Sequence, residues 1–461
     1  MEKPNIILIN CDDLGYGDLA CYGSTVNKTP YLDKMAAEGV RFTDYHVMSP
    51  VCSASRAALM TGCYPQRVGV PGVLFPGNAI GLHPDEITIA DVLKGEGYRT
   101  KIVGKWHCGD QPAFLPTNHG FDEYYGLPYS NDMGIQGPIE KRPERVPLPL
   151  LRNDEVIQEQ PDQRGLTERY TEECVRFIRD NKQGPFFLYL AHMYVHVPLF
   201  VPDRFLKQAK NGGYGAAVEC IDWVAGVLFD ELRRQGLDEN TIVIFTSDNG
   251  SRARDEGGSN APLRGNKATT WEGGQRVPCI VRWPGSVPAR RVCDELITSM
   301  DFLPTLARLA GTTAPRDRTI DGKDIAPLLL GEKGAASPHA VFYYYIQQRL
   351  EAVRKGKWKL HVGKGQMFAR SSEPVKELYD LDADIGEQEN VYDQHPDVVA
   401  DLMATLDAAR QDLGDAITET EGNGCRPVGR VDNPQPLATY NPDHPYIVAA
   451  YDTPDTAVMG G

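Results

Sequence analysis

The stretch Asn5-Ile6-Ile7-Leu8-Ile9-Asn10 is a short, continuously apolar run between two asparagines near the start of the chain. Such a run is typical of a strand buried on both faces of a parallel sheet. Further strand patterns occur at 100–104, 184–190 and 241–246, and helical patterns lie at 29–39, 88–97 and 214–235. This alternation predicts an α/β fold with a largely parallel central sheet between helices.

The pattern changes near residue 336. Strand patterns at 340–345 and 351–360 indicate an antiparallel hairpin, and 398–413 has a helical pattern. We therefore expect a larger α/β domain over 1–335. A small C-terminal α+β subdomain over 336–461 should hold an antiparallel sheet, a helix and an extended tail.

The bulk properties restrict the partners of the chain. A net charge of −15 over 461 residues argues against nucleic acid or an anionic membrane as a partner. No apolar run reaches the length of a membrane span. The first residues lead directly into a strand, so we expect no signal peptide and a cytoplasmic protein, or a periplasmic or secreted one if a leader was removed. The ten cysteines lack zinc-finger spacing and favour free thiols in a reducing compartment.

Oxygen donors follow two of the predicted strands. Asp12 and Asp13 come after the first, and Asp248 and Asn249 come after the strand at 241–246. In parallel sheets, ligands bind at the carboxyl ends of the strands. Three carboxylates and an amide, with no His or Cys, favour calcium or magnesium over zinc. Taken alone, an Asp-Asp pair is more often a helix cap or a turn.

The segment 49–62, SPVCSASRAALMTG, places Cys52 near the start of a predicted helix and Arg56 one turn further on the same face. The free N–H groups and the dipole of a helix N-terminus favour an anion. Together with the arginine, they indicate an oxyanion site. The alternative is a buried structural cysteine beside a surface arginine.

This segment, with the Thr61-Gly62 that ends it, resembles the signature of the formylglycine-dependent (type I) sulfatases of the alkaline phosphatase superfamily. The resemblance spans 5–382 and is closest to the arylsulfatase A and N-acetylgalactosamine-6-sulfatase type. It implies an alkaline-phosphatase-like fold, in which residues 1–335 form the catalytic domain. It also implies hydrolysis of a sulfate monoester, either on a sulfated small molecule or on a sulfated glycan. We expect a glycan substrate, from which an exo-acting enzyme removes a galactose-type or N-acetylgalactosamine-type sulfate.

The family pattern also implies a set of site residues. Cys52 would be oxidised to formylglycine by a maturase, and Ala54, where many relatives have proline, is associated with maturases of the radical type. Calcium, or less expectedly magnesium, would be bound by Asp12, Asp13, Asp248 and Asn249. The other catalytic residues would be Arg56, Lys105, His107, His196 and Lys267. Substrate contacts would come from Ser130, Lys105, His196 and Lys267.

The same pattern assigns an order of events. The hydrate of formylglycine would attack sulfur with Asp248 as base, and His196 or Lys267 would protonate the leaving alcohol. His107 would then remove the proton that lets the covalent sulfate depart. Without the family context, each lysine would be an ordinary surface group and each histidine merely hydrogen-bonded. His192 would compete with His196.

Three other functions remain open from the sequence: a broad aryl sulfatase, a phosphate or phosphonate ester hydrolase, and a non-catalytic binding protein. Specificity is expected from the loops at 68–83 and 132–162 and from the C-terminal unit. The aromatic and basic residues noted there are Phe75, Arg142, Arg145, Tyr343, Tyr344 and Tyr345.

Overall fold

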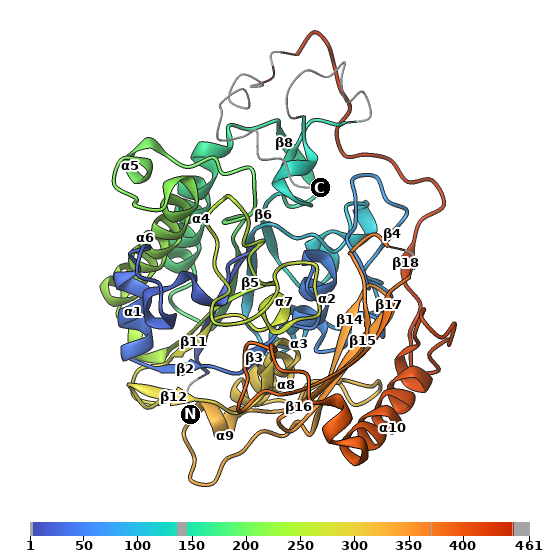
Figure 1. Ribbon diagram of the computed structural model, residues 1–461. Helices are drawn as coiled ribbons and strands as arrows, with labels where there is room; N and C mark the ends of the chain where they lie inside the picture. Colours follow the sequence, from blue (N-terminus) through green and yellow to red (C-terminus); the bar gives the residue numbers. More distant parts are fainter. Residues whose placement is uncertain (1–2, 136–144, 370, 445, 447–461) are drawn as a thin grey trace.

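The computed structural model describes residues 3–135, 145–369, 371–444 and 446 (Figure 1). A ten-stranded sheet crosses the larger part of the molecule, in the order β12-β2-β11-β10-β1-β9-β5-β6-β7-β8. Its five central strands are parallel: β10 (Thr241–Ser247), β1 (Asn5–Cys11), β9 (Phe186–Ala191), β5 (Arg99–Gly104) and β6 (Glu123–Gly126). The expected α/β fold with a largely parallel sheet is confirmed.

Short strands extend this sheet on both sides. Beyond β10 lie β11 (Cys279–Arg282), β2 (Val40–Phe42) and β12 (Arg291–Cys293), and beyond β6 lie β7 (Pro149–Arg152) and β8 (Glu155–Glu159). Most of these pairs are antiparallel. The sequence did not predict them because strands of three to five residues show too little periodicity to stand out.

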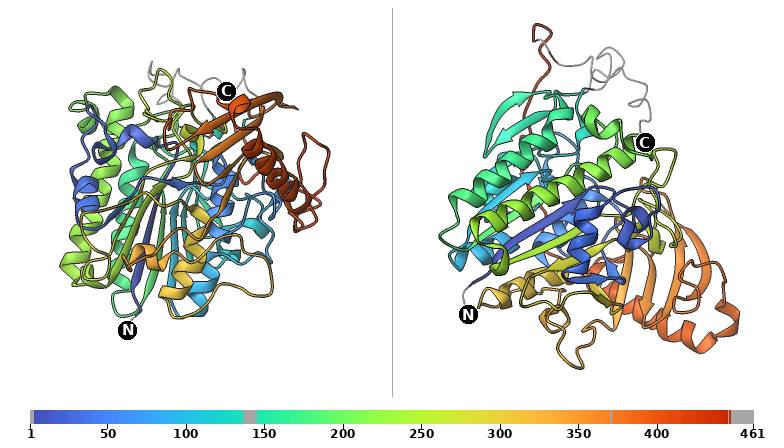
Figure 2. Two further views of the ribbon diagram at one scale, coloured as in Figure 1. Left: turned by 60° about the horizontal axis from the view of Figure 1, so that its bottom comes forward. Right: turned by 90° about the vertical axis from the view of Figure 1, so that its left-hand side faces the viewer.

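Helices cover both faces of the sheet, as Figure 2 shows from two sides. Ile7 and Ile9 of β1 lie in one apolar layer with α1 (Pro30–Ala37), α4 (Leu166–Asp180) and α6 (Gly212–Gln235). The alternate residues Ile6 and Leu8 lie in a second layer with α2 (Cys52–Thr61), α3 (Ile89–Gly95) and α8 (Phe302–Leu309). Burial on both faces explains why the β1 sequence is continuously apolar.

A second, antiparallel sheet forms the C-terminal part. It contains β14 (Val341–Ile346), β15 (Arg349–Lys355), β16 (Trp358–Lys364) and β17 (Glu373–Asp380), with α10 (Pro396–Leu413) packed against it. β14 and β15 form the expected antiparallel hairpin, and a turn at 356–357 divides the predicted strand 351–360 into β15 and β16. The expected C-terminal antiparallel sheet is therefore confirmed, whereas the boundary at 335/336 stays a prediction.

The remaining elements are short. Two-stranded sheets join β13 (Ile297–Thr298) to β3 (Tyr45–His46) and β18 (Gly429–Arg430) to β4 (Ile80–Gly81). The single-turn helices are α5 (Asp203–Leu206), α7 (Glu272–Gln275) and α9 (Ala326–Leu329). None of the helices in the described ranges has the length and apolar composition that crossing a membrane requires.

Candidate active site

The two acidic pairs lie side by side because β1 and β10 are in register. Cys11 pairs with Ser247, so both strands end at the same level. The backbone N–H of Asp13 donates to Asp248 Oδ1 over 3.2 Å, and Asn249 Nδ2 donates to Asp13 Oδ1 over 2.7 Å. Asp12, like these three, is almost fully buried. The sheet thus gathers three carboxylates and one amide at a single buried point.

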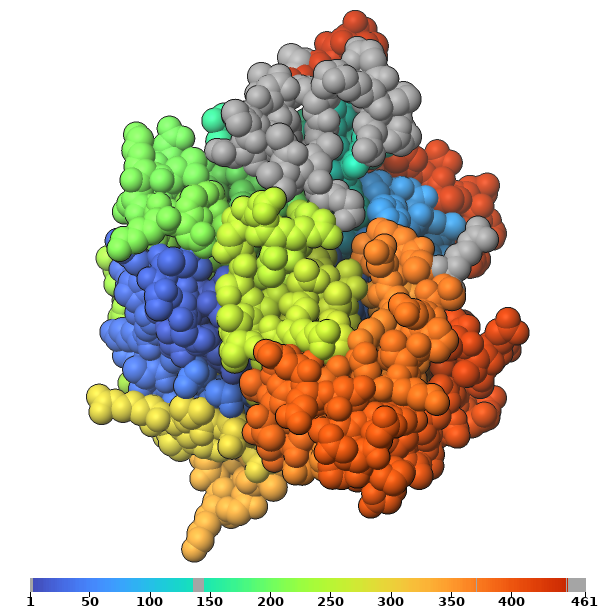
Figure 3. Space-filling view, viewed as in Figure 1, coloured from blue at the N-terminus to red at the C-terminus, as the bar shows by residue number. Residues whose placement is uncertain are grey.

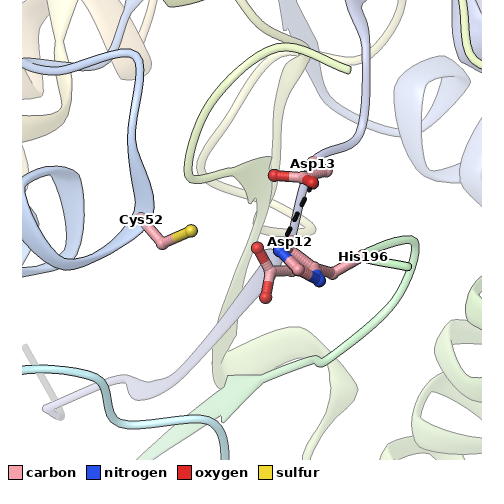
Figure 4. A group of neighbouring side chains, drawn as sticks. All are labelled: Asp12, Asp13, Cys52 and His196. Carbon is pink, nitrogen blue, oxygen red and sulfur yellow. Dashed lines mark ion pairs between the residues drawn. The ribbon is translucent and has the colours of Figure 1, made fainter. Parts of the chain in front are cut away.

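Cys52 is the first residue of α2, and its side chain points toward Asp12 and Asp13, which follow β1, in Figure 4. Arg56 lies one turn further along the helix, and its guanidinium contacts the segments that follow β10 and β5. Its Nε donates to Asp248 Oδ2 and its Nη1 to the Lys105 carbonyl, both over 2.8 Å. Every residue of α2 is buried, so this helix start is fixed inside the protein.

Two lysines form ion pairs with the two aspartates that follow β1. Lys105 Nζ lies 2.5 Å from Asp12 Oδ2, and Lys267 Nζ lies 2.7 Å from Asp13 Oδ1. The chain turns sharply before Lys105, and Gly104 has a φ of +109°. A Cβ on Gly104 would lie 1.9 Å from the Ala191 carbonyl oxygen, so this turn requires glycine.

The histidine segments also reach the site. His196 Nε2 lies 3.8 Å from Asp13 Oδ2, the ion pair dashed in Figure 4. Its Nδ1 lies 3.5 Å from Ser130 Oγ. His192 instead accepts the Tyr194 backbone N–H with Nδ1. Of the two histidines in this segment, His196 is the one that lines the pocket.

The buried charges shift each other's pKa values. Burial opposes ionisation of Asp12, but Lys105, His196 and Arg56 hold its pKa well below the usual range. Burial and the neighbouring Asp12 raise the pKa of Asp248 to about 7, against the effect of Arg56. Because these carboxylates lie close together and are surrounded by cations, the ionisation of each one depends on the charge of the others.

Cys52 and His107 are both neutral at pH 7 in this environment. Burial raises the pKa of the Cys52 thiol to about 12, although Lys105 and Lys267 lower it in part. Burial, followed by the charges of Lys105 and Arg56, lowers the pKa of His107 far below its ordinary value. An unmodified thiol here is protonated and therefore a poor nucleophile.

The donor atoms fit a divalent cation. Ligand atoms of Asp12, Asp13, Cys52 and His196 all lie within 4.8 Å of one another. Asp12 Oδ1 and the amide oxygen of Asn249 are buried and have no hydrogen-bond partner in the described part of the chain. Buried oxygens without donors are what a hard cation would satisfy. The geometry thus supports a metal site.

A second group of possible metal ligands is already neutralised. Asp44, His46 and Glu272 lie close together, but Asp44 pairs with both guanidinium nitrogens of Arg354 at 2.8–2.9 Å. Glu272 Oε1 lies 2.9 Å from Lys359 Nζ. Buried side-chain cations thus already neutralise these carboxylates. The cluster instead links the catalytic part to β15 and β16, a link the sequence did not predict.

The predicted catalytic residues lie at a pocket of about 510 Å³. Cys52, His107, Ser130, His196 and Lys267 all line it. Arg56 and Lys105 lie behind them, bound to the aspartates, so the structure brings together every predicted site residue. What each one does in the reaction stays a prediction. In Figure 3 the yellow-green segment around 250–270, the blue loop near 70 and the orange C-terminal sheet meet on one face.

The pocket mouth corrects part of the sequence prediction. Phe75 and Arg145 line it as expected, whereas Tyr344 and Tyr345 are fully buried in the core of the C-terminal sheet and Tyr343 does not line it. The three tyrosines are therefore not among the residues that line this pocket. Arg142 lies outside the described residues. The lining residues that the sequence did not single out include Asp132, Arg252, Arg254, Met367 and Phe368.

Comparison with known proteins identifies the family. The sulfatase profile matches residues 4–312, and that of the N-sulphoglucosamine sulphohydrolase C-terminal region matches 266–412. The chain belongs to the sulfatase family. It is 41% identical to arylsulfatase A of Homo sapiens over 427 residues, which cover 85% of this chain and 83% of that protein.

Two further relatives agree with this assignment. N-acetylgalactosamine-6-sulfatase of Canis lupus familiaris is 41% identical over 382 residues, covering 78% of this chain and 72% of that one. The crystal structure of Ps i-CgsB in complex with k-i-k-neocarrahexaose superposes with a TM-score of 0.79 at 29% identity, covering 92% of this chain and 96% of that one. The chain is thus a sulfuric ester hydrolase that acts on sulfated substrates.

Proposed function

We propose that this sulfatase removes a sulfate group from a sugar, with a formylglycine derived from Cys52 as nucleophile and Ca²⁺ held by Asp12, Asp13, Asp248 and Asn249. The observation that carries the proposal is the position of Cys52, at the start of a buried helix and facing the two aspartates that follow β1. When present, the cation and the formylglycine would supply charge neutralisation and an oxygen nucleophile that can release sulfate by elimination.

The side chains of the chain itself would then bind and orient the ester. Lys105 and Lys267 are fixed by ion pairs at the bottom of the site, where they would stabilise the negative sulfuryl oxygens. Arg56 cannot move freely because Asp248 and the Lys105 carbonyl hold it. Its role is to keep Asp248 and the helix start in place while its charge acts on the bound anion.

Proton transfer would involve three groups that line the pocket or its base. His196 and Lys267 lie beside Asp13 and can donate a proton to the leaving oxygen. His107 is neutral and lines the same pocket, so it can accept a proton. Its Nε2 lies 3.0 Å from the Leu74 carbonyl oxygen.

Two findings favour a sugar as the substrate. The relative from Canis lupus familiaris is named for an N-acetylgalactosamine sulfate, and the structural neighbour contains an oligosaccharide. A pocket of about 510 Å³ also has room for more than a sulfate group. We further propose that a maturase of the radical type converts Cys52, because alanine occupies position 54.

A substrate comparison tests this function. The protein, co-expressed with a maturase, is assayed on 4-nitrophenyl sulfate, 4-nitrophenyl phosphate, and galactose and N-acetylgalactosamine 6-sulfates, with Cys52→Ala as the control. We expect turnover of sulfate esters that the control lacks, with kcat/KM higher on a sugar sulfate than on the phosphate. Activity on the aryl sulfate alone would indicate a broad aryl sulfatase. Preference for the phosphate would contradict the proposal.

A further inference from the structure

Arg252 is a buried arginine whose charge has no partner among the residues that the structure describes. Its side chain lines the catalytic pocket and the residue is only 9% exposed. Within the described ranges, its guanidinium makes no hydrogen bond or ion pair, and Nη1 is fully shielded from solvent. A buried cation that lacks a counter-charge is costly, because it has lost water without gaining an acceptor. Such a group is therefore expected to meet an anion from outside the chain.

The backbone fixes Arg252 next to the catalytic lysine. The carbonyl of Ser251 accepts the Lys267 backbone N–H over 2.9 Å, and the carbonyl of Arg252 accepts Asn266 Nδ2 over 2.9 Å. Lys267 itself pairs with Asp13. In the described part of the chain Arg252 has no such acidic partner, so its charge is available to a ligand in the same pocket.

The rest of the pocket mouth is also cationic. Arg145 and Arg254 line it beside Arg252, and Asp132 is the single carboxylate among the described lining residues. Among the described residues, the hydrogen-bond acceptor of Arg145 is the Asp132 backbone carbonyl, which carries no full charge. The whole protein, in contrast, carries a net charge of −15. Positive charge concentrated at one pocket of an acidic protein indicates recognition of a polyanionic ligand.

Two exposed aromatic rings lie at the same mouth. Phe75 is 45% exposed and Phe368 is 59% exposed, and both line the pocket. Their ring centroids are 6.3 Å apart with an interplanar angle of 37°. This spacing is that of a direct aromatic contact, so the rings form one apolar ledge and leave no slot between them. Exposed aromatic surface beside a charged pocket suits the apolar C–H face of a sugar ring.

We propose that Arg252, supported by Arg254, forms a second anion subsite, so that the preferred substrate is a glycan carrying another anionic group near the sulfate that is removed. That group is a second sulfate or a carboxylate, and the sugar ring bearing it lies on the ledge of Phe75 and Phe368. The inference rests on the proposed function. An arginine suits either anion because its planar guanidinium can donate two parallel hydrogen bonds.

Matched substrates test this subsite. The wild type, Arg252→Gln and Arg252→Lys are compared on N-acetylgalactosamine 6-sulfate, N-acetylgalactosamine 4,6-disulfate and a disaccharide that joins N-acetylgalactosamine 6-sulfate to a uronic acid. We expect Arg252→Gln to lower kcat/KM on the two doubly charged substrates about 10- to 100-fold more than on the singly charged one, mainly through KM. Arg252→Lys should retain much of the preference for doubly charged substrates because lysine keeps the positive charge. The doubly charged substrate whose kcat/KM falls more in Arg252→Gln identifies the second anion: sulfate for the disulfate, carboxylate for the disaccharide.

Two exposed arginines provide a second test that does not disturb the buried site. Arg254→Ala should lower the same preference to a smaller degree, whereas Arg316→Ala, exposed and outside the pocket lining, should leave it unchanged. If Arg252→Gln does not fold, this pair of variants decides the question. Added NaCl should raise KM for the doubly charged substrates more than for the singly charged one.

Equal losses on all substrates in Arg252→Gln would overturn the inference, since Arg252 would then contact the reactive sulfate or only shape the pocket. An unchanged preference in both Arg252→Gln and Arg254→Ala would overturn it as well. In either case the wild type would still hydrolyse sulfate esters and the proposed function would stand. A wild type that hydrolyses none of the sulfated sugars would instead contradict the proposed function.

Discussion

Replacing Lys359 by methionine tests whether the C-terminal sheet holds the catalytic segment in place. Lys359 is fully buried, and its Nζ lies 2.9 Å from Glu272 Oε1 and 2.8 Å from Glu387 Oε1. Glu387 Oε2 also accepts the Glu272 backbone N–H over 2.8 Å. These contacts fix the start of α7, five residues after Lys267.

The substitution should lower the free energy of unfolding because it leaves the carboxylates of Glu272 and Glu387 without the cation that they share. Removing one partner of a buried ion pair costs about 3–5 kcal/mol. An unfolding entropy of about 2.1 cal/mol/K per residue gives ~1 kcal/mol/K for 461 residues, so the Tm should fall by about 3–5 °C if the chain unfolds as one unit. His46, Tyr344 and Arg276 still contact Glu272, which limits the loss.

Lys357 offers a matched control in the same hairpin. Its side chain is 43% exposed and pairs with Asp380, a surface contact worth about 0–1 kcal/mol. Thermal unfolding of Lys359→Met and Lys357→Met is compared, together with kcat/KM on a sulfate ester well below the Tm. We expect only Lys359→Met to lose both stability and activity, and Lys359→Met/Glu387→Gln to regain part of the stability. A Tm for Lys359→Met within 1 °C of the control would refute the reasoning.

Three further predictions concern the metal, proton transfer and stability. Asp13→Ala should lower both the calcium content and the activity, whereas the exposed Asp317→Ala should change neither. Tightly bound zinc would contradict this. His196→Ala and Lys267→Ala should each be compared on a sugar sulfate and on 4-nitrophenyl sulfate. Substituting the residue that donates the proton should lower activity on the sugar sulfate up to ~10²–10⁴-fold more than on 4-nitrophenyl sulfate, because nitrophenolate leaves unprotonated. Equal losses of activity on both substrates would assign that residue to sulfate binding. Burial raises the pKa of Asp222 to about 7, above the unfolded value of 3.8, so its ionisation destabilises the fold as pH rises between these values. The free energy of unfolding of Asp222→Asn, relative to that of the wild type, should therefore rise by roughly 1–4 kcal/mol from pH 4 to pH 8. A difference in Tm that does not depend on pH would argue against this prediction.

Much of the fold could be predicted because its central strands carry a local signal. The runs at 5–10 and 241–246 are buried on both faces, and the structure places them as neighbours in register. This register also explains how Asp12 and Asn249, more than two hundred residues apart, could be predicted to converge. Short edge strands such as β2 have no comparable signal, because three residues cannot show a period.

The remaining parts of the site depend on long-range packing. Glu272 and Lys359 belong to different sheets, and neither residue has a local motif that indicates a partner. The aromatic run at 343–345 suggested an exposed binding surface, yet two of its three rings are in the core, because strand residues of the small sheet pack under α10 and α2. That Arg252 lacks a partner in the described ranges could be recognised only once the surrounding side chains were placed.

The most direct test of the central claim is peptide mass spectrometry of residue 52 in preparations that differ in maturase level, with sulfate-ester turnover measured on the same samples. The account predicts that specific activity rises in proportion to the fraction of Cys52 converted to formylglycine and vanishes in Cys52→Ala. Full activity from a preparation in which residue 52 is entirely unmodified cysteine would contradict it.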